Sequence, residues 1–194
     1  MVNNFEIINN LLTFESSDDF YHLQILQRKK EHEELGRNSY VVRTYCIREG
    51  QLMDKKDEII KLCDLFGARA YINLNVRSFE SLAFQTLKKV TDQIMNKDFK
   101  SVKTAFESVC GMYGTGRNSS WIIDIDGDTD DELLFAIELH VNGCRPYGEN
   151  KIIAKIPTKN GIHIITKPFD KSDFSPTFGS IDIHKNNPTV LYVP

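Results

Sequence analysis

The second half of the chain alternates between short apolar runs typical of strands and segments typical of helices. This alternation limits the folds that the chain can adopt more than any other feature of the sequence. The elements that we expect there are strands at 120–126, 151–157, 161–167, 180–185 and 189–193, a helix at 131–142, and an irregular stretch around Pro176. The turn Lys159-Asn160-Gly161 favours a hairpin between two of these strands.

The expected order of strands brings distant polar residues together. Strand-helix-strand-strand-irregular-strand is typical of a ferredoxin-like or RRM-like sheet, in which the first strand lies between the third and the fourth. Asp124 and Asp126 on the first strand, His163 on the third and Asp182 on the fourth would then lie on three adjacent strands. We therefore expect one site, provided that these side chains leave the same face.

The first half of the chain predicts an α/β module. Its expected strands are 20–30, 40–48 and 69–77. Its expected helices are a short one at 5–13, one at 52–66, one that begins after the capping residue Ser78, and one at about 100–112. Segment 20–30 also fits a helical stripe, but we favour a strand paired with 40–48. The glycine-rich turn at 111–116 is not a Walker loop, because no Lys-Ser/Thr follows it.

The expected fold class is therefore α/β (α+β). One domain, 1–194, would consist of two lobes, with an N-terminal α/β module at 1–117 packed on a ferredoxin-like or RRM-like module at 118–194. Apolar residues make up 41% of the chain and charged residues 26%, which is ordinary for a soluble globular protein. The length of 194 residues suffices for a substantial core.

Several features argue against a membrane or secreted protein. No apolar run approaches the roughly 20 residues needed to cross a bilayer, and no signal peptide is visible at the N-terminus. The cysteines Cys46, Cys63, Cys110 and Cys144 show no CxxC spacing, which favours reduced thiols over a structural zinc site. We expect a cytoplasmic protein without a membrane partner.

The charge is unevenly distributed. The net charge is −3, yet residues 145–171 carry six Lys or Arg against two acids, and residues 124–132 carry six acids and no base. Adjacent acidic and basic segments suit a metal-dependent phosphate site, although solvated surface charge produces similar runs.

Asp124 and Asp126 are the strongest candidates for metal ligands. Side chains two residues apart leave the same face of a strand, and carboxylates in an apolar strand are costly unless they are paired. The alternative is a strand end whose aspartates cap the next helix, which explains Asp128 and Asp130 better than Asp124. An EF-hand loop fits poorly, because Thr129 stands where its glycine should be.

A second cluster, 158–163, combines phosphate-binding side chains with a tight turn. Thr158, Lys159, Asn160, Gly161 and His163 can together grip a triphosphate through side-chain donors and backbone amides. An ordinary hairpin with a structural histidine would show the same residues.

Two further candidates are weaker alone. Asp182 lies between Ile181 and Ile183, where a surface-facing edge strand would look the same. Arg77 lies on the polar side of strand 69–77 and could contact phosphate or a base, although a solvated strand face is also consistent.

The ordered trio Ile123-Asp124-Ile125-Asp126, Gly161-Ile162-His163 and Ile181-Asp182 resembles the motifs of the archaeo-eukaryotic primase (primase-polymerase) superfamily, in a minimal form. The preceding segment from Ala70 to Arg77 is similar to that family's N-terminal module. The resemblance covers roughly residues 40–194.

This resemblance implies a metal-dependent nucleotidyltransferase that makes or extends a primer. Asp124, Asp126 and Asp182 would be catalytic and would coordinate Mg²⁺ or Mn²⁺. The nucleotide would be bound by Thr158, Lys159, Asn160, Gly161, His163 and Arg77. The implied partners are nucleoside triphosphates, a single-stranded or primed nucleic-acid template, and helicase or other replication proteins. Two alternatives stay open: a catalytically silent RRM-like nucleic-acid-binding protein, and a metal-dependent phosphohydrolase or nuclease.

Overall fold

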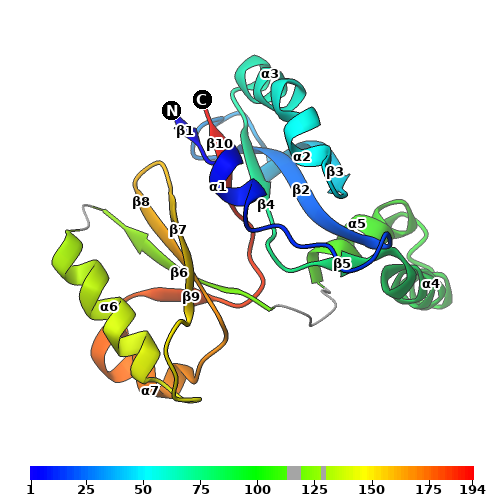
Figure 1. The fold of residues 1–194 in the computed structure, drawn as a ribbon. Helices are drawn as coiled ribbons and strands as arrows, with labels where there is room; N and C mark the ends of the chain where they lie inside the picture. Colours follow the sequence, from blue (N-terminus) through cyan, green and yellow to red (C-terminus); the bar gives the residue numbers. More distant parts are fainter. Residues whose placement is uncertain (113–118, 128–129) are drawn as a thin grey trace.

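The computed structural model describes residues 1–112, 119–127 and 130–194, which form two antiparallel sheets with helices against them (Figure 1). The strands are β1 (Val2–Asn3), β2 (Asp19–Arg28), β3 (Ser39–Ile47), β4 (Arg69–Ile72), β5 (Arg77–Ser78), β6 (Trp121–Asp126), β7 (Ile152–Pro157), β8 (Gly161–Thr166), β9 (Asp182–His184) and β10 (Thr189–Val193). The helices are α1 (Phe5–Asn9), α2 (Gln51–Asp54), α3 (Lys56–Phe66), α4 (Phe79–Met95), α5 (Ala105–Met112), α6 (Asp131–Gly143) and α7 (Lys171–Phe178), with a 3₁₀ turn at Ser101–Thr104. The general α+β class is confirmed.

The first sheet has the strand order β1-β10-β4-β2-β3, and β5 pairs with one end of β2. The predicted pairing of 20–30 with 40–48 is confirmed, with Tyr21 opposite Ile47 and Arg28 opposite Ser39. Most residues of β2 are buried, and many of them are apolar or aromatic. Tertiary packing therefore stabilises a strand in this segment, whose periodicity alone fits either a strand or a helix. The predicted helix after Ser78 is also confirmed and is α4. The Ser78 side chain caps it by accepting a hydrogen bond from the Ser81 amide.

The second sheet has the strand order β7-β8-β6-β9. Its first strand, β6, therefore lies between the third, β8, and the fourth, β9, as predicted. Helix α6 is capped by Asp130, whose carboxylate accepts a 2.7 Å hydrogen bond from the Leu133 amide. The predicted contribution of Asp128 to this helix end lies outside the described residues, as does most of the predicted glycine-rich turn at 111–116.

Two expectations for the C-terminal part were wrong. The stretch around Pro176 is not irregular but forms helix α7, which Asp170 caps and which buries Phe174. Burial and the cap offset the one backbone hydrogen bond that proline removes. Strand β10 pairs with β1 and β4 of the first sheet, so the expected module at 118–194 gives its last strand to the N-terminal sheet.

The two sheets share a core. Ile122, Ile156 and Ile165 of the second sheet belong to the same buried cluster as Leu23 and Ile72 of the first. The opposite face of the second sheet buries Ile123, Ile125 and Ile164 together with residues of α6 and α7. Because each strand of the second sheet thus alternates between a helix-covered face and a face toward the first sheet, polar residues on the latter lie between the sheets.

Side-chain amides fasten the two sheets at the edges of this core. The Asn4 amide donates to the carbonyls of Pro157 at 2.8 Å and Val190 at 2.9 Å. The Asn75 side chain accepts a 2.7 Å hydrogen bond from the Ser120 amide at the start of β6. These bonds fix how the polar faces oppose one another.

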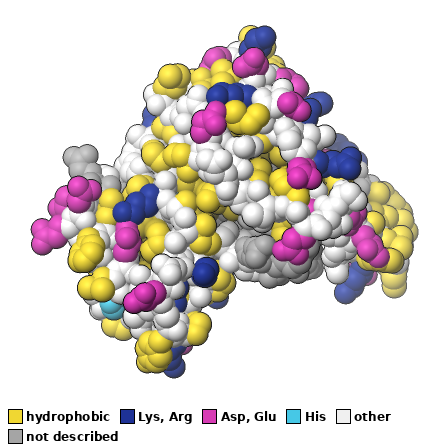
Figure 2. All heavy atoms as spheres, viewed as in Figure 1, with side chains coloured by type: hydrophobic (Ala, Val, Ile, Leu, Met, Phe, Trp, Pro, Cys, Tyr) yellow, Lys and Arg dark blue, Asp and Glu magenta, His cyan; other side chains and the backbone are white. Residues whose placement is uncertain are grey.

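The surface is mixed in charge, with hydrophobic side chains gathered at the end of the molecule where α4 lies (Figure 2). The exposed apolar residues of this helix include Phe84, Leu87 and Met95. None of the helices in the described ranges combines the length and apolar character needed for a membrane crossing.

Candidate functional site

A row of three polar side chains crosses the second sheet. His163 on β8 and Asp182 on β9 are both direct register partners of Asp124 on the central strand β6. Residues directly opposite one another in an antiparallel sheet leave the same face, with Cβ atoms about 4.5–5.5 Å apart. The expectation that these residues share one face is therefore confirmed.

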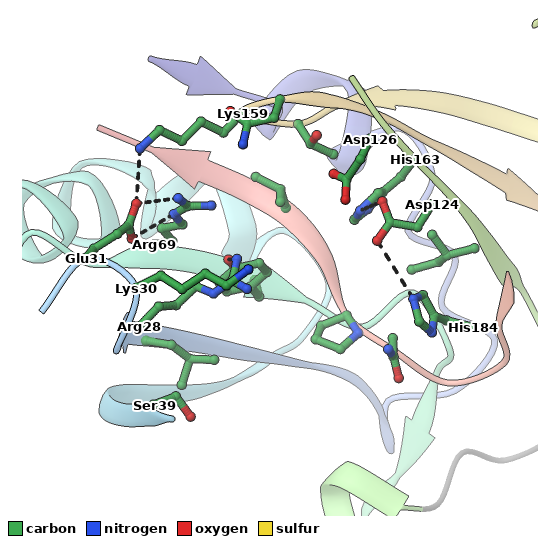
Figure 3. Close-up of a pocket in the computed structure, with 18 of the residues that line it drawn as sticks. Arg28, Lys30, Glu31, Ser39, Arg69, Asp124, Asp126, Lys159, His163 and His184 are labelled. Atoms are coloured by element: carbon green, nitrogen blue, oxygen red, sulfur yellow. Dashed lines mark hydrogen bonds and ion pairs between the residues drawn. The ribbon is translucent and has the colours of Figure 1, made fainter. Parts of the chain in front are cut away.

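This face borders a cleft of about 540 Å³ between the two sheets. Asp124 and Asp126 of β6, His163 of β8 and His184 of β9 lie at one end of it (Figure 3). The turn between β7 and β8 contributes Thr158, Lys159 and Asn160. The sequence-predicted residues that line the cleft are thus Asp124, Asp126, Thr158, Lys159, Asn160 and His163.

Asp124 lies between two imidazoles. Its Oδ1 is 3.3 Å from Nε2 of His163, and its Oδ2 is 3.8 Å from Nε2 of His184. The other ring nitrogen of His163, Nδ1, lies 2.8 Å from the hydroxyl of Thr189 on β10. Both nitrogens of His163 are therefore engaged, which fixes the orientation of the ring.

Burial lowers the pKa of His163, because the imidazolium would lose its water, while the neighbouring Asp124 carboxylate acts in the opposite direction. Only 12% of the His163 side chain is exposed, against 30% of Asp124. The carboxylate therefore remains open to the cleft although the imidazole beside it is enclosed.

The hairpin turn is held by backbone contacts that require glycine at position 161. The Thr158 amide donates to the Gly161 carbonyl at 2.9 Å, and the Gly127 amide donates to the Asn160 carbonyl at 2.7 Å. A Cβ atom on Gly161 would lie 2.0 Å from the Ile125 carbonyl oxygen, closer than any side chain permits. Gly161 thus lets β8 approach β6 directly beside Asp126, its register partner.

Asp182 lies in the row but borders a different hollow. It lines a second depression of about 380 Å³, together with Asp124 and Asp126. These three carboxylates are donors of the kind that Mg²⁺ and Mn²⁺ prefer. Within the described ranges, no group of three or more His, Cys, Asp or Glu side chains is arranged as a metal centre.

Arg77, which the sequence predicts to bind the nucleotide, does not line the cleft. Its side chain is fully buried, and it donates hydrogen bonds to the carbonyl oxygens of Cys110, at 2.9 Å, and Asn75. Burial lowers its pKa to about 10. The strand ends at Ile72, and the chain then turns inward through the Asn73 side chain, which accepts from the Asn75 amide. This turn carries Arg77 away from the cleft.

Sequence reasoning missed the wall that the first sheet contributes. The cleft is lined by Arg28 at the end of β2, by Lys30 and Glu31 just after this strand, and by Arg69 and Tyr71 of β4. In the predicted strand 69–77, Arg69 and Tyr71 lie on the same polar side as Arg77. The sequence therefore indicates the correct side of this strand, but the residues that line the cleft are at its beginning and not at its end. His184, two residues after Asp182, carried a signal in the same alternation.

Comparisons of the chain with protein-family models, with curated proteins and with solved structures give no match. The function is therefore argued from the geometry and chemistry of this cleft.

Proposed function

We propose that the cleft binds a nucleoside triphosphate with divalent cations and transfers its nucleotidyl group to a primer on a nucleic-acid template, as the resemblance to primase-polymerases implies. The observation that carries this proposal is the row of His163, Asp124 and Asp182 across β8, β6 and β9. His163 and Asp124 of this row line the cleft whose other wall carries Arg28, Lys30 and Arg69. Acidic and basic groups on facing walls suit a ligand that brings both cations and phosphates.

In the proposed reaction the 3′-hydroxyl of the primer gives its proton to solvent water, and its oxygen forms a bond to the α-phosphorus. The bond between that phosphorus and the bridging oxygen breaks, and pyrophosphate leaves. Bound Mg²⁺ or Mn²⁺ would supply charge stabilisation at the attacking and leaving oxygens. Asp124 and Asp126 would hold the ions, with Asp182 as a further carboxylate from the adjacent strand.

The remaining residues of the second sheet would position the triphosphate. Lys159 and the turn at Asn160 would contact its phosphates, since a lysine ammonium and exposed backbone amides both bind phosphate oxygens. The enclosed His163 ring, held by Thr189, would present Nε2 at the edge of the cleft beside Asp124.

Thermal stabilisation by a nucleotide tests the binding part of this proposal. A ligand that binds only the folded state raises the melting temperature by mass action. Wild type should be stabilised by a nucleoside triphosphate with Mn²⁺ more than by either alone. The variant Asp124→Asn/Asp126→Asn should lose this combined effect, and the matched control Asp92→Asn, on the distant helix α4, should keep it.

Analysis of the products separates this function from the two alternatives. Nucleotide incorporation supports the proposal. Shortened strands or released inorganic phosphate without incorporation would indicate a nuclease or phosphohydrolase that uses the same carboxylates. Nucleic-acid binding that is indifferent to chelators and to Asp124→Asn would indicate a silent binding protein.

A further inference from the structure

We propose that Arg69 and Lys159, with Arg28 and Lys30, form a subsite for the terminal phosphates of the nucleotide, and that the Glu31 carboxylate occupies this subsite until the nucleotide displaces it. This inference rests on the proposed function and adds the first sheet to the nucleotide site. It also assigns a competing role to a residue of the protein itself.

Glu31 is held as a phosphate oxygen pair would be held. Its Oε2 accepts a 3.0 Å hydrogen bond from Nε of Arg69, and its Oε1 accepts from Nη2 of the same guanidinium. This two-point contact uses the planar fork that arginine presents equally to carboxylates and to phosphates. The Arg69 side chain is only 12% exposed, so its fork has a fixed direction within the cleft.

Lys159 reaches the same carboxylate from the opposite wall. Its Nζ lies 3.1 Å from Oε1 of Glu31, across the space between the hairpin turn and the first sheet (Figure 3). Glu31 is thus bound by one cation from each sheet. An anion at its place would bridge the two walls in the same way.

Cationic charge at this end exceeds what Glu31 can neutralise. Arg28 and Lys30 line the same cleft, and within the described ranges neither forms an ion pair; Arg28 donates only a 3.4 Å hydrogen bond to the Tyr71 hydroxyl. Two cationic side chains therefore bind Glu31, and two more line the same end of the cleft. A ligand with several negative charges matches this surplus better than a single carboxylate does.

The position of the subsite matches a triphosphate. Lys159 belongs to the turn that continues through Asn160 to Gly161, the register partner of Asp126. A phosphate chain that follows this turn would have its reactive end beside Asp124 and Asp126 and its far end at Arg69. A nucleic-acid backbone is a poorer match, because the Arg69 side chain is recessed and holds both oxygens of one terminal group through Nε and Nη2.

Titration calorimetry with inorganic tripolyphosphate, in EDTA and without nucleotide, tests the subsite by itself. Glu31→Gln keeps the shape of the side chain but removes the charge that competes, so we expect roughly tenfold tighter binding than in wild type. Arg69→Gln and Lys159→Gln should each weaken binding by roughly tenfold or more. The matched controls Glu33→Gln and Lys29→Gln, on neighbouring residues that do not line the cleft, should bind as wild type does.

Lys159 is half exposed on a turn, so its substitution leaves folding intact even if Arg69→Gln does not. Equal affinities in wild type, Glu31→Gln and Lys159→Gln would overturn the inference. It would also be overturned if Glu31→Gln tightened the binding of an oligothymidylate but not of tripolyphosphate. Failure of nucleotide incorporation with tripolyphosphate binding intact would count against the proposed function alone.

Discussion

The imidazole of His163 lies opposite the carboxylate of Asp124 across the β8–β6 pair, with Nε2 3.3 Å from Oδ1. Thr189 of β10 holds the other side of the ring, so a strand of the first sheet orients a residue of the second. The position of this imidazole therefore depends on the contact between the two sheets.

Removing the imidazole should weaken nucleotide binding. For His163→Gln we expect the KM for the nucleotide to rise roughly tenfold or more, because a charged phosphate oxygen loses a donor. Steady-state incorporation kinetics measure this change.

Removing the Thr189 hydroxyl that contacts the His163 ring should also raise the KM for the nucleotide, but by less. Thr189→Val deletes the hydroxyl at Nδ1 of His163 and should raise KM by a few-fold. Thr166→Val is the matched control, because the Thr166 hydroxyl is buried without a partner in the described structure. An equal effect of both threonine substitutions would contradict the positioning role of Thr189.

A side chain at Gly161 should destabilise the second sheet. Gly161→Ala would force a Cβ against the Ile125 carbonyl and should lower the free energy of unfolding by about 1–3 kcal/mol or more. Urea denaturation followed by circular dichroism measures this change.

Gly143→Ala provides the contrast. A Cβ at Gly143, the last residue of α6, meets nothing within 4 Å, and alanine favours a helix over glycine. This variant should be as stable as wild type or slightly more so. Equal losses in both variants would show that the close approach at Gly161 is not the cause.

Arg77 should matter for stability and not for nucleotide binding. Arg77→Met leaves the buried carbonyl of Cys110 without its donor and should cost about 2 kcal/mol or more of unfolding free energy. The affinity of the folded variant for nucleotide should equal that of wild type, as measured by titration calorimetry. A large loss of affinity in a folded variant would restore Arg77 to the site.

The buried His22 should make the protein sensitive to mild acid. Burial, reinforced by Arg77, lowers the pKa of His22 from 6.5 to about 4. Between pH 6.5 and pH 4 the unfolded state therefore binds a proton more readily than the folded state does. The free energy of unfolding is highest above pH 6.5 and decreases as the pH falls toward 4. The loss amounts to about 3 kcal/mol.

Urea midpoints between pH 7 and pH 4 measure this effect. In His22→Leu, which cannot titrate, the midpoint should fall less steeply over the same interval than in wild type. Parallel pH profiles for the two proteins would show that the acid sensitivity arises elsewhere.

Local sequence patterns sufficed for the second sheet and for one half of the site. Alternation along 120–126 and the Asn160-Gly161 turn predict β6 and the β7–β8 hairpin, and the strand order then aligns Asp124 with His163 and Asp182. These signals are local or follow from a common topology.

The other half of the site depends on tertiary contacts that no local pattern specifies. Arg28 and Arg69 reach the cleft only because the second sheet packs against the first, and Arg77 leaves it because the chain turns at Asn73. The sequence of β10 resembles that of any other apolar strand, so it does not predict that this strand pairs with the first sheet.

Incorporation of labelled nucleotides into a primed template with Mn²⁺ or Mg²⁺ tests the central claim most directly. Wild type would be compared with Asp124→Asn/Asp126→Asn and with the control Asp92→Asn, all shown to be folded. We predict extension products from wild type and the control that vanish in the double variant. Extension that persists in the double variant, or none from folded wild type on any template, would contradict the account.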